Sequence, residues 1–414
     1  MLTPFELIAL LLVVTAIFAW INHVLIRLPH TIGLLVMGLA ASLALVGLEL
    51  AFPDITIYEG TTALLRQLDF REAVLNGMLA FLLFAGALHV DLSLLRSRAW
   101  SVGLMATLGT LFSTAIVGLG FWWAAGALGL PVPLIWALVF GALISPTDPV
   151  AVLSTLKSVR VPKELEADMA GESLFNDGVG VVVFTVLLAI AAGGGETGPL
   201  QIAELFFMEA IGGALFGLAA GYVAYRAMRA IDNYPIETLV SLALVTGTYA
   251  IAAKLHMSGP IAVVVAGILV GNRGPEDALS EETQSYLFSF WTLVDEILNS
   301  VLFLLIGLEV LVLSFDPSFA WLAAASIPLA LAGRFFSVAI PVALLSLRQS
   351  FVRGTVPILI WGGLRGGISI ALALSLPENP ERPLLLAATY AVVLFTIILQ
   401  GLSLKAVIRR TATD

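Results

Sequence analysis

Cysteine is absent from this chain of 414 residues, and charged residues are few. The lack of cysteine excludes disulfide bonds, thiolate metal sites and cysteine nucleophiles. Only 12% of the residues are charged and 59% are hydrophobic, whereas soluble domains have about 25% charged residues. Too little polar surface remains for a globular protein in water. No basic run of the kind that binds nucleic acid occurs either, so we expect no nucleic-acid partner.

Long apolar runs occupy most of the chain. Runs of about 20 residues or more recur along the chain, which is enough to cross a hydrocarbon core about 30 Å thick. Because lipid cannot satisfy backbone polar groups and the runs lack the alternation of barrel strands, they are predicted to be helices. The expected fold class is an all-α integral membrane protein of about thirteen transmembrane helices, surrounded by membrane lipid. The predicted spans are 5–26, 31–51, 72–90, 99–127, 134–156, 168–193, 203–229, 235–254, 258–272, 288–313, 318–346, 352–376 and 384–407.

The distribution of basic residues supports this count and predicts the orientation. Fourteen Lys and Arg residues, Arg98 among them, fall on one side of a thirteen-helix topology. Four fall on the other side: Arg66, Arg71, Lys254 and Arg382. Because cytoplasmic loops are enriched in Lys and Arg, we expect a plasma (cell inner) membrane protein with an external N-terminus and a cytoplasmic C-terminus. The first span lacks a preceding basic segment and is expected to be a retained helix.

The fifth predicted helix, 134–156, contains an interruption. Pro146 and Pro149 each remove a helix donor and clash with a preceding carbonyl group, so the helix should be broken between them. Broken helices in transporters supply backbone oxygens to cations near the midplane, and Asp148 adds a carboxylate at the break. The alternative is a proline kink in which Asp148 only caps the following half-helix.

The sixth predicted helix carries a polar cluster. Ser173 and Asp177 are four residues apart and share a face, with Asn176 beside them. Together with Asp148, these oxygen-bearing side chains suit a small monovalent cation. They also suit a proton, because a desolvated carboxylate can exchange H⁺ for a metal ion near neutral pH. The alternative is a polar cluster that only holds helices together.

Two of the 20 basic residues remain after the loop residues are assigned, Arg334 and Arg365, and both lie inside predicted spans, as Glu172 does. A charge at this depth costs at least about 2.5–3.5 kcal/mol and is normally paired. We expect Glu172 and Arg334 to form a structural ion pair, which leaves Asp177 as the titrating group. Arg365 stands among four glycines in the twelfth helix. It either compensates the partial charges of half-helix ends at a point where two interrupted helices cross, or extends to the cytoplasmic face with its charge in water.

The fifth and twelfth helices, both interrupted, are seven apart in order and therefore opposite in orientation. Helices 1–6 and 8–13 are accordingly predicted to be inverted repeats, with the seventh as a connector. Interrupted segments at matching positions of two halves indicate a transport site. For Asp295, Glu296 and Asn299 two interpretations are open: they line a cytoplasmic funnel, or they form a solvated helix start.

Three segments together resemble the monovalent cation/proton antiporter family, specifically the NhaP-type sodium/proton exchangers. They are Ser145–Val152, Gly171–Gly178 and Trp361–Ser369, and the resemblance covers essentially the whole chain. It implies a homodimer in which a mobile ion-binding core moves against a dimerisation unit. The implied core is helices 4–6 (93–195) and 11–13 (316–414), the dimerisation unit is helices 1–3 (1–92) and 8–10 (233–315), and helix 7 (196–232) connects them.

The resemblance also implies the roles of site residues. Asp177 and Asp148 bind the cation in exchange for protons, and Ser173 and the Thr147 backbone are further ligands. Asn176 stands where electrogenic relatives carry a second aspartate, and members with the Asn-Asp pair are regarded as electroneutral. The stabilising ion pair of such relatives matches Glu172 and Arg334. One departure is Ala85, at the position where many relatives carry a glutamate.

The sequence thus predicts a secondary active exchanger of Na⁺ for H⁺, with Li⁺ and K⁺ left open as substrates and no cofactor beyond the transported ions. Two other classes are open. A carrier of small organic anions should present more cationic or hydroxyl donors than carboxylates at the crossing. An intramembrane hydrolase needs a nucleophile with a base, and Ser173 has no histidine in its span.

Overall fold

The computed structural model describes residues 3–52, 70–148, 152, 161–193, 207–311, 316–347 and 349–411. Within these ranges the secondary structure is entirely helical, with no strand. Nine of the helices in this part of the chain are long and apolar enough to cross a membrane. The prediction of an all-α membrane protein is therefore confirmed.

The helices of the N-terminal half follow the predicted spans, with several π-helical turns (η). They are α1 (Pro4–Ile21), η1 (Asn22–Ile26), α2 (His30–Ala51), η2 (Glu72–Met78), α4 (Leu79–Leu88), α5 (Leu92–Ser97), α6 (Ala99–Leu104), η3 (Met105–Gly109), α7 (Thr110–Ala127), α8 (Leu134–Ile144) and α10 (Lys163–Ala191). Most of these elements belong to long apolar stretches that continue through a π-helical turn or a short break.

The helices of the C-terminal half are similar in length and character. They are η4 (Met208–Gly212), α12 (Gly213–Met228), α13 (Tyr234–Lys254), α14 (Gly259–Asp277), α15 (Glu281–Glu309), η5 (Pro317–Phe319, a 3-10 turn), α16 (Ala320–Leu345), α17 (Thr355–Trp361), α18 (Gly367–Leu374), α19 (Arg382–Phe395), η6 (Thr396–Gln400) and α20 (Gly401–Thr411).

Some helices begin earlier than predicted. Helix α10 starts at Lys163 and α15 at Glu281, whereas the predicted spans began at 168 and 288. Both first turns carry acidic residues, and Ser280 caps α15 by accepting a hydrogen bond from the Thr283 N–H (3.3 Å). Acidic side chains stabilise a helix N-terminus but lower hydropathy. Hydropathy therefore locates the apolar part of a helix and not its first turn.

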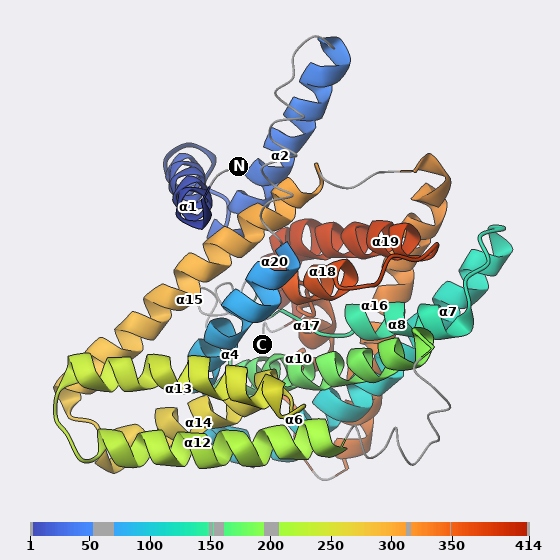
Figure 1. Ribbon diagram of the computed structural model, residues 1–414. Helices are drawn as coiled ribbons and strands as arrows, with labels where there is room; N and C mark the ends of the chain where they lie inside the picture. The colour runs from blue at the N-terminus through green and yellow to red at the C-terminus, as the bar shows by residue number, and fades with distance from the viewer. Residues whose placement is uncertain are drawn as a thin grey trace.

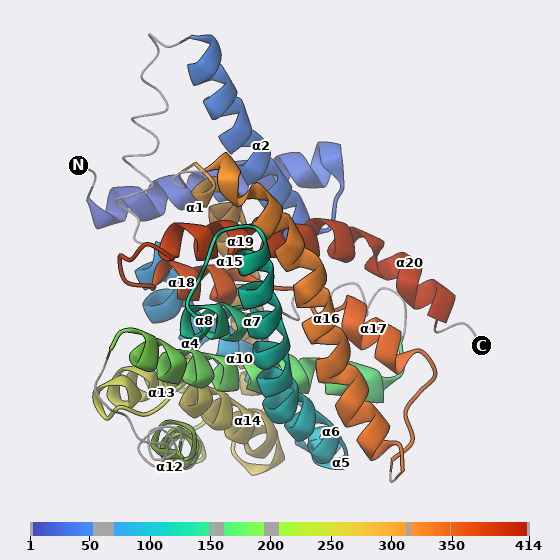
Figure 2. The same ribbon diagram turned by 90° about the vertical axis from the view of Figure 1, so that its right-hand side faces the viewer.

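The helices pack in two groups (Figures 1 and 2). In the first group, α2 packs on α15, α4 packs on α14 and α15, and α12, α13 and α14 pack on one another. In the second group, α7 packs on α8 and α16, α10 on α8, and α19 on α16 and α18. Contacts of α10 with α4 and α14 join the two groups.

Glycines allow the closest helix contacts within each group. A Cβ at Gly217 on α12 would lie 2.1 Å from the Ala262 carbonyl oxygen on α14. A Cβ at Gly141 on α8 would lie 2.2 Å from the Thr114 carbonyl oxygen on α7. Small residues at such crossings are typical of membrane helices, whose association depends on close packing.

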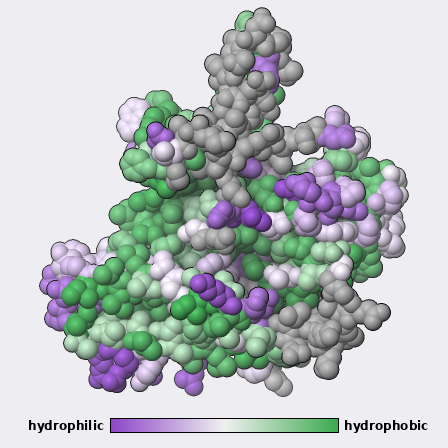
Figure 3. All heavy atoms as spheres, viewed as in Figure 1, coloured by the Kyte–Doolittle hydropathy of each residue, from purple (hydrophilic) through white to green (hydrophobic). Residues whose placement is uncertain are grey.

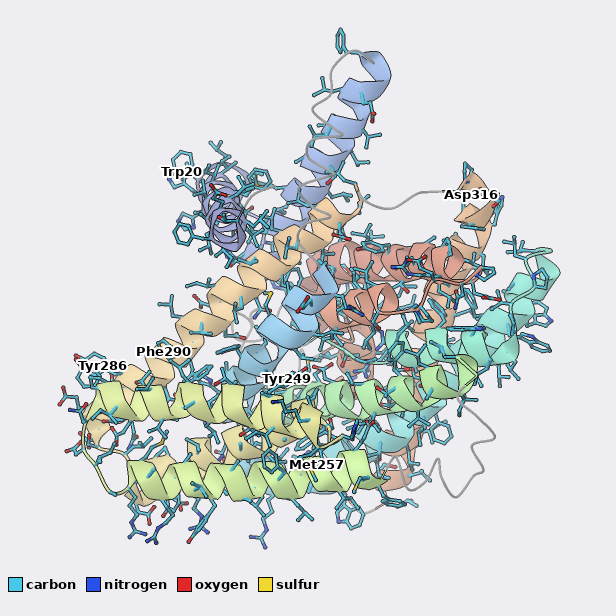
Figure 4. The ribbon with its side chains drawn as sticks, viewed as in Figure 1. Trp20, Tyr249, Met257, Tyr286, Phe290 and Asp316 are labelled. Atoms are coloured by element: carbon cyan, nitrogen blue, oxygen red, sulfur yellow. The ribbon has the colours of Figure 1, made fainter. Side chains whose placement is uncertain are left out.

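Apolar side chains cover much of the outer surface, as Figure 3 shows for one face. Trp20 on α1 is 63% exposed, and Tyr286 at the start of α15 is 51% exposed (Figure 4). Large exposed aromatic groups of this kind suit contact with lipid and its interface. Asp316, outside the apolar helices, accepts a hydrogen bond from the Ser318 N–H (2.9 Å), which lowers the pKa of its carboxyl group.

Candidate functional site

Two non-helical segments meet inside the second group of helices. Helix α8 ends at Ile144 and the chain continues without helix through Asp148. Helix α17 ends at Trp361, and α18 begins only at Gly367. The Asp148 backbone N–H donates to the Leu364 carbonyl oxygen (2.8 Å). One backbone group of each segment thus finds its partner in the other segment.

The second segment approaches Asp148 so closely that only glycine fits at position 366. A Cβ at Gly366 would lie 2.3 Å from Asp148 Oδ2 and 2.6 Å from its Cβ. We expect Gly366→Ala to displace the Asp148 side chain and to lower the free energy of unfolding by about 1–3 kcal/mol, as overpacking does. Thermal unfolding of the purified protein measures this.

Gly103→Ala is the matched control for Gly366→Ala. Gly103 lies in α6, and a Cβ there meets nothing within 4 Å. Alanine also favours the helical backbone more than glycine does. The melting temperature of Gly103→Ala should therefore equal or exceed that of the wild type. Equal melting temperatures for Gly366→Ala and Gly103→Ala would show that the contact with Asp148 is not tight.

Arg365 is buried at the crossing, with 1% of its surface exposed. Its Nη1 donates to the carbonyl oxygens of Ser145 and Pro146, the latter at 2.9 Å, and its backbone N–H donates to Thr396 Oγ1 (3.1 Å). The alternative in which Arg365 extends to the cytoplasmic face is therefore wrong. Backbone oxygens at the break were expected to be available to a cation, but these two face a guanidinium group.

A hydrogen-bond network joins the first segment to α10. The Thr147 N–H donates to Asn176 Oδ1 (3.2 Å), and Asn176 Nδ2 donates to Thr147 Oγ1 (2.8 Å). Thr147 Oγ1 and Ser173 Oγ share a further hydrogen bond of 2.9 Å. All three side chains are buried. Ser173 and Asn176, which the sequence placed in one cluster, both contact Thr147, and the polar side-chain atoms of the three residues largely satisfy one another.

Asp177 and Asp148 line one cavity of about 490 Å³. Asp177 is 6% exposed, and its Oδ1 has no hydrogen-bond partner among the described residues. A buried carboxylate oxygen without a partner costs free energy unless it binds something. The cavity lies between the two groups of helices, because α4 and α15 line one side while α10, α18 and residues 146–148 line the other.

The part of α15 that faces this cavity carries further polar residues: Thr292, Asp295, Glu296 and Asn299. Asn299 is 2% exposed, and its Nδ2 donates to Asp295 Oδ1 (3.0 Å). Of the two interpretations of this helix, lining of the cavity is the one that the structure supports. Ala85 is 1% exposed, and its neighbour Gly86 lines the cavity.

Glu172 and Arg334 lie against each other. Arg334 Nη1 and Nη2 donate to the two carboxylate oxygens of Glu172, the second at 2.9 Å. Arg334 Nε and Nη2 also donate to the Leu359 carbonyl oxygen, at 3.0 and 2.7 Å. The Arg334 side chain is 4% exposed and the Glu172 side chain is 2% exposed. The pair thus joins α10, α16 and the last turns of α17.

Sequence reasoning missed a second buried ion pair. Arg98, which was assigned to a loop, is 6% exposed, and its Nε donates to Asp168 Oδ1 (2.9 Å) while its Nη2 contacts Oδ2. Its guanidinium group also lies over the Phe351 ring, 4.8 Å from the centroid. The available signal was the spacing of Asp168, Glu172 and Asn176, which places three polar residues on one face of α10. Ser369, in a motif already noted, was also given no role.

Comparisons with known proteins identify similar chains. The family model "Sodium/hydrogen exchanger, transmembrane" matches residues 10–410. The chain is 47% identical over 415 residues to the Na⁺/H⁺ antiporter NhaP of Pseudomonas aeruginosa, covering 98% of this chain and 96% of that protein. It is 39% identical to the Na⁺/H⁺ antiporter NhaH of Halobacillus aidingensis, covering 90% and 91%. Its fold matches the sodium proton antiporter MjNhaP1 of Methanocaldococcus jannaschii, with a TM-score of 0.76, 20% identity and 99% of each chain covered.

Proposed function

Because the chain belongs to the family of transmembrane sodium/hydrogen exchangers, we propose that it exchanges Na⁺ for H⁺ at Asp177 and Asp148. The observation that carries this proposal is the buried Asp177 Oδ1, which lacks a hydrogen-bond partner among the described residues and lines a cavity with Asp148. Asp177 binds H⁺ and Na⁺ in turn, and Asp148 completes the site. The protein is a multi-pass membrane transporter.

The remaining site residues hold these carboxylates in place. Thr147, Ser173 and Asn176 fix the first non-helical segment against α10. In this proposal Ser173 and Thr147 are further ligands of the cation, and Asn176 belongs to the same transport site. Arg365 supplies positive charge to the carbonyl groups at the end of α8. With Asn176 in place of a second aspartate, one carboxylate exchanges one proton for one cation, so transport is electroneutral.

The architecture that goes with this mechanism has thirteen helices in two inverted repeats, with helices 5 and 12 discontinuous. The second group of helices is the moving core (93–195 and 316–414). The first group without α12 is the dimerisation unit of a homodimer (1–92 and 233–315), and α12 belongs to the connecting segment, 196–232. A cavity between the two groups supports this division, since relative movement there opens the site to alternate sides. The N-terminus is external and the C-terminus is cytoplasmic.

A carrier of organic anions is not supported. Among the described residues that line the cavity, four are acidic and none is Lys, Arg or His: the acidic ones are Asp148, Asp177, Asp295 and Glu296. An anionic solute would be repelled at this short range. The matched family and relatives also point to cation exchange.

Competition between Na⁺ and H⁺ tests the proposed function. A proton and Na⁺ cannot occupy the same carboxylate, so lowering the pH should raise the KM for Na⁺ while the rate at saturating Na⁺ stays the same. In the range where the carboxylate is mostly protonated, KM should rise about tenfold for each pH unit. Na⁺-driven proton movement in proteoliposomes at several pH values measures both quantities. A maximal rate that falls at constant KM would contradict competition.

A further inference from the structure

Ser369 lies in the first turn of α18 and lines the cavity that Asp148 and Asp177 share. It is 1% exposed, and its Oγ has no hydrogen-bond partner among the described residues. We propose that the Ser369 hydroxyl is a ligand of the transported cation, contributed by the second of the two crossing segments. This inference rests on the proposed function and extends its site to α18.

The other hydroxyl groups near the crossing already have partners. Thr147 and Ser173 bind each other. Ser145 Oγ donates to the Gly141 carbonyl oxygen (2.7 Å), and Thr396 Oγ1 both accepts from the Arg365 N–H and donates to the Val393 carbonyl oxygen (3.0 Å). Ser369 differs from these residues because it lines the cavity and its Oγ has no such bond among the described residues. The Ser369 Oγ is therefore available to bind a ligand.

A second, independent observation points to the same ligand. Asp177 Oδ1 is also buried without a partner, and it lines the same cavity from α10. Buried polar atoms are normally hydrogen-bonded. Two residues that line one cavity and each carry an unpartnered oxygen atom therefore indicate an occupant that these oxygen atoms coordinate. A hard cation gathers several oxygen ligands and accepts a neutral hydroxyl among them. Sodium fits this description, and an apolar solute does not.

The charges at the crossing define what Ser369 contributes. The positive end of the α18 dipole alone would disfavour a cation, so Asp148 and Asp177 must supply the attraction. The hydroxyl then adds one neutral oxygen on a different helix. Because its distance from the carboxylates is set by packing, it affects which ionic radius fits best. Ser369 should therefore influence affinity and selectivity without affecting charge balance.

The test compares Ser369→Ala with Ser113→Ala. Ser113, on α7, is also a buried serine whose Oγ lacks a partner among the described residues, but it does not line the cavity. In proteoliposomes, Ser369→Ala should raise the KM for Na⁺ about tenfold, as expected for a lost contact to a charged group. The maximal rate should be unchanged and the ratio of Na⁺ to Li⁺ affinity should shift. Ser113→Ala should leave KM and rate unchanged.

The outcomes separate this inference from the proposed function. An unchanged KM in Ser369→Ala, with Asp177→Asn inactive, would overturn the ligand role and leave exchange at Asp177 standing. Activity in Asp177→Asn would instead overturn the proposed function. If Ser369→Ala does not fold, Ser369→Cys provides the second variant, since sulfur is a softer ligand than oxygen. It should raise the KM for Na⁺ more than that for Tl⁺, and an unchanged ratio would overturn the proposal.

Discussion

Replacing Asp177 with asparagine is expected to abolish Na⁺-driven proton movement while the protein still folds. The amide keeps the size of the carboxylate but can neither carry the negative charge that binds Na⁺ nor accept the exchanged proton. Because Asp177 Oδ1 has no hydrogen-bond partner among the described residues, neutralising it breaks no such contact there and relieves the cost of burying a charge. The melting temperature should therefore equal or exceed that of the wild type.

The assay for Asp177→Asn uses proteoliposomes with and without a clamped membrane potential. Wild-type exchange should be the same in both conditions, because one proton leaves for each Na⁺ that binds. Asp232→Asn is the matched control: Asp232 is exposed, so the same chemical change there should leave the rate unaltered. Exchange in Asp177→Asn at more than a few per cent of the wild-type rate would remove Asp177 from the mechanism.

The sequence was sufficient to predict an all-helical membrane fold and some of the contacts among the candidate site residues. Two prolines around Asp148 cannot be accommodated in a regular helix, so the end of α8 could be expected near them. The four-residue spacing of Ser173 and Asp177 placed both on one face of α10, and the structure brings this face to Thr147. These are local properties of the chain, which periodicity and steric exclusion determine.

Pairings between distant segments could not be derived in the same way. Arg98 and Asp168 are separated by 70 residues, and no periodic pattern relates one to the other. Arg98 lies at the end of a helix, where an exposed arginine is the usual finding. The role of Ser369 depended on knowing which hydroxyl groups lack partners, which only the three-dimensional arrangement shows. Residues 149–151 and 153–156 of the fifth predicted span lie outside the described residues.

The structure also changes the role assigned to the non-helical backbone. The sequence suggested that a helix broken by Pro146 and Pro149 would supply backbone oxygens to a cation. Instead, Arg365 donates to the carbonyl oxygens of Ser145 and Pro146. The positive charge of this guanidinium group repels a metal cation near the two carbonyl oxygens. Side-chain oxygens around the cavity are consequently the better candidates for ligands.

Breaking the Glu172–Arg334 pair is expected to have the largest effect on stability. Replacing Arg334 with Met, or Glu172 with Gln, leaves a buried charge without its partner and should lower the free energy of unfolding by about 3–5 kcal/mol. Thermal unfolding of the purified protein, with monodispersity by size-exclusion chromatography, measures the loss. The exchange rate per folded molecule should fall by a smaller factor than the yield of folded protein, because neither residue lines the cavity that Asp177 lines.

The double variant Glu172→Leu/Arg334→Met distinguishes the contribution of the ion pair to stability from that of the neighbouring contacts. Removing both charges eliminates the unpaired group, so stability should recover relative to either single variant. Recovery should be incomplete, because the Leu359 carbonyl oxygen then loses the donors that Arg334 provides. The exposed pair Arg273–Glu276, at 3.3 Å with side chains 66% and 63% exposed, is the control: Arg273→Gln should change stability by at most about 1 kcal/mol. If Arg334→Met is no less stable than Arg273→Gln, the buried pair does not stabilise the junction of α10, α16 and α17, and the loss of the Leu359 contacts must also be negligible.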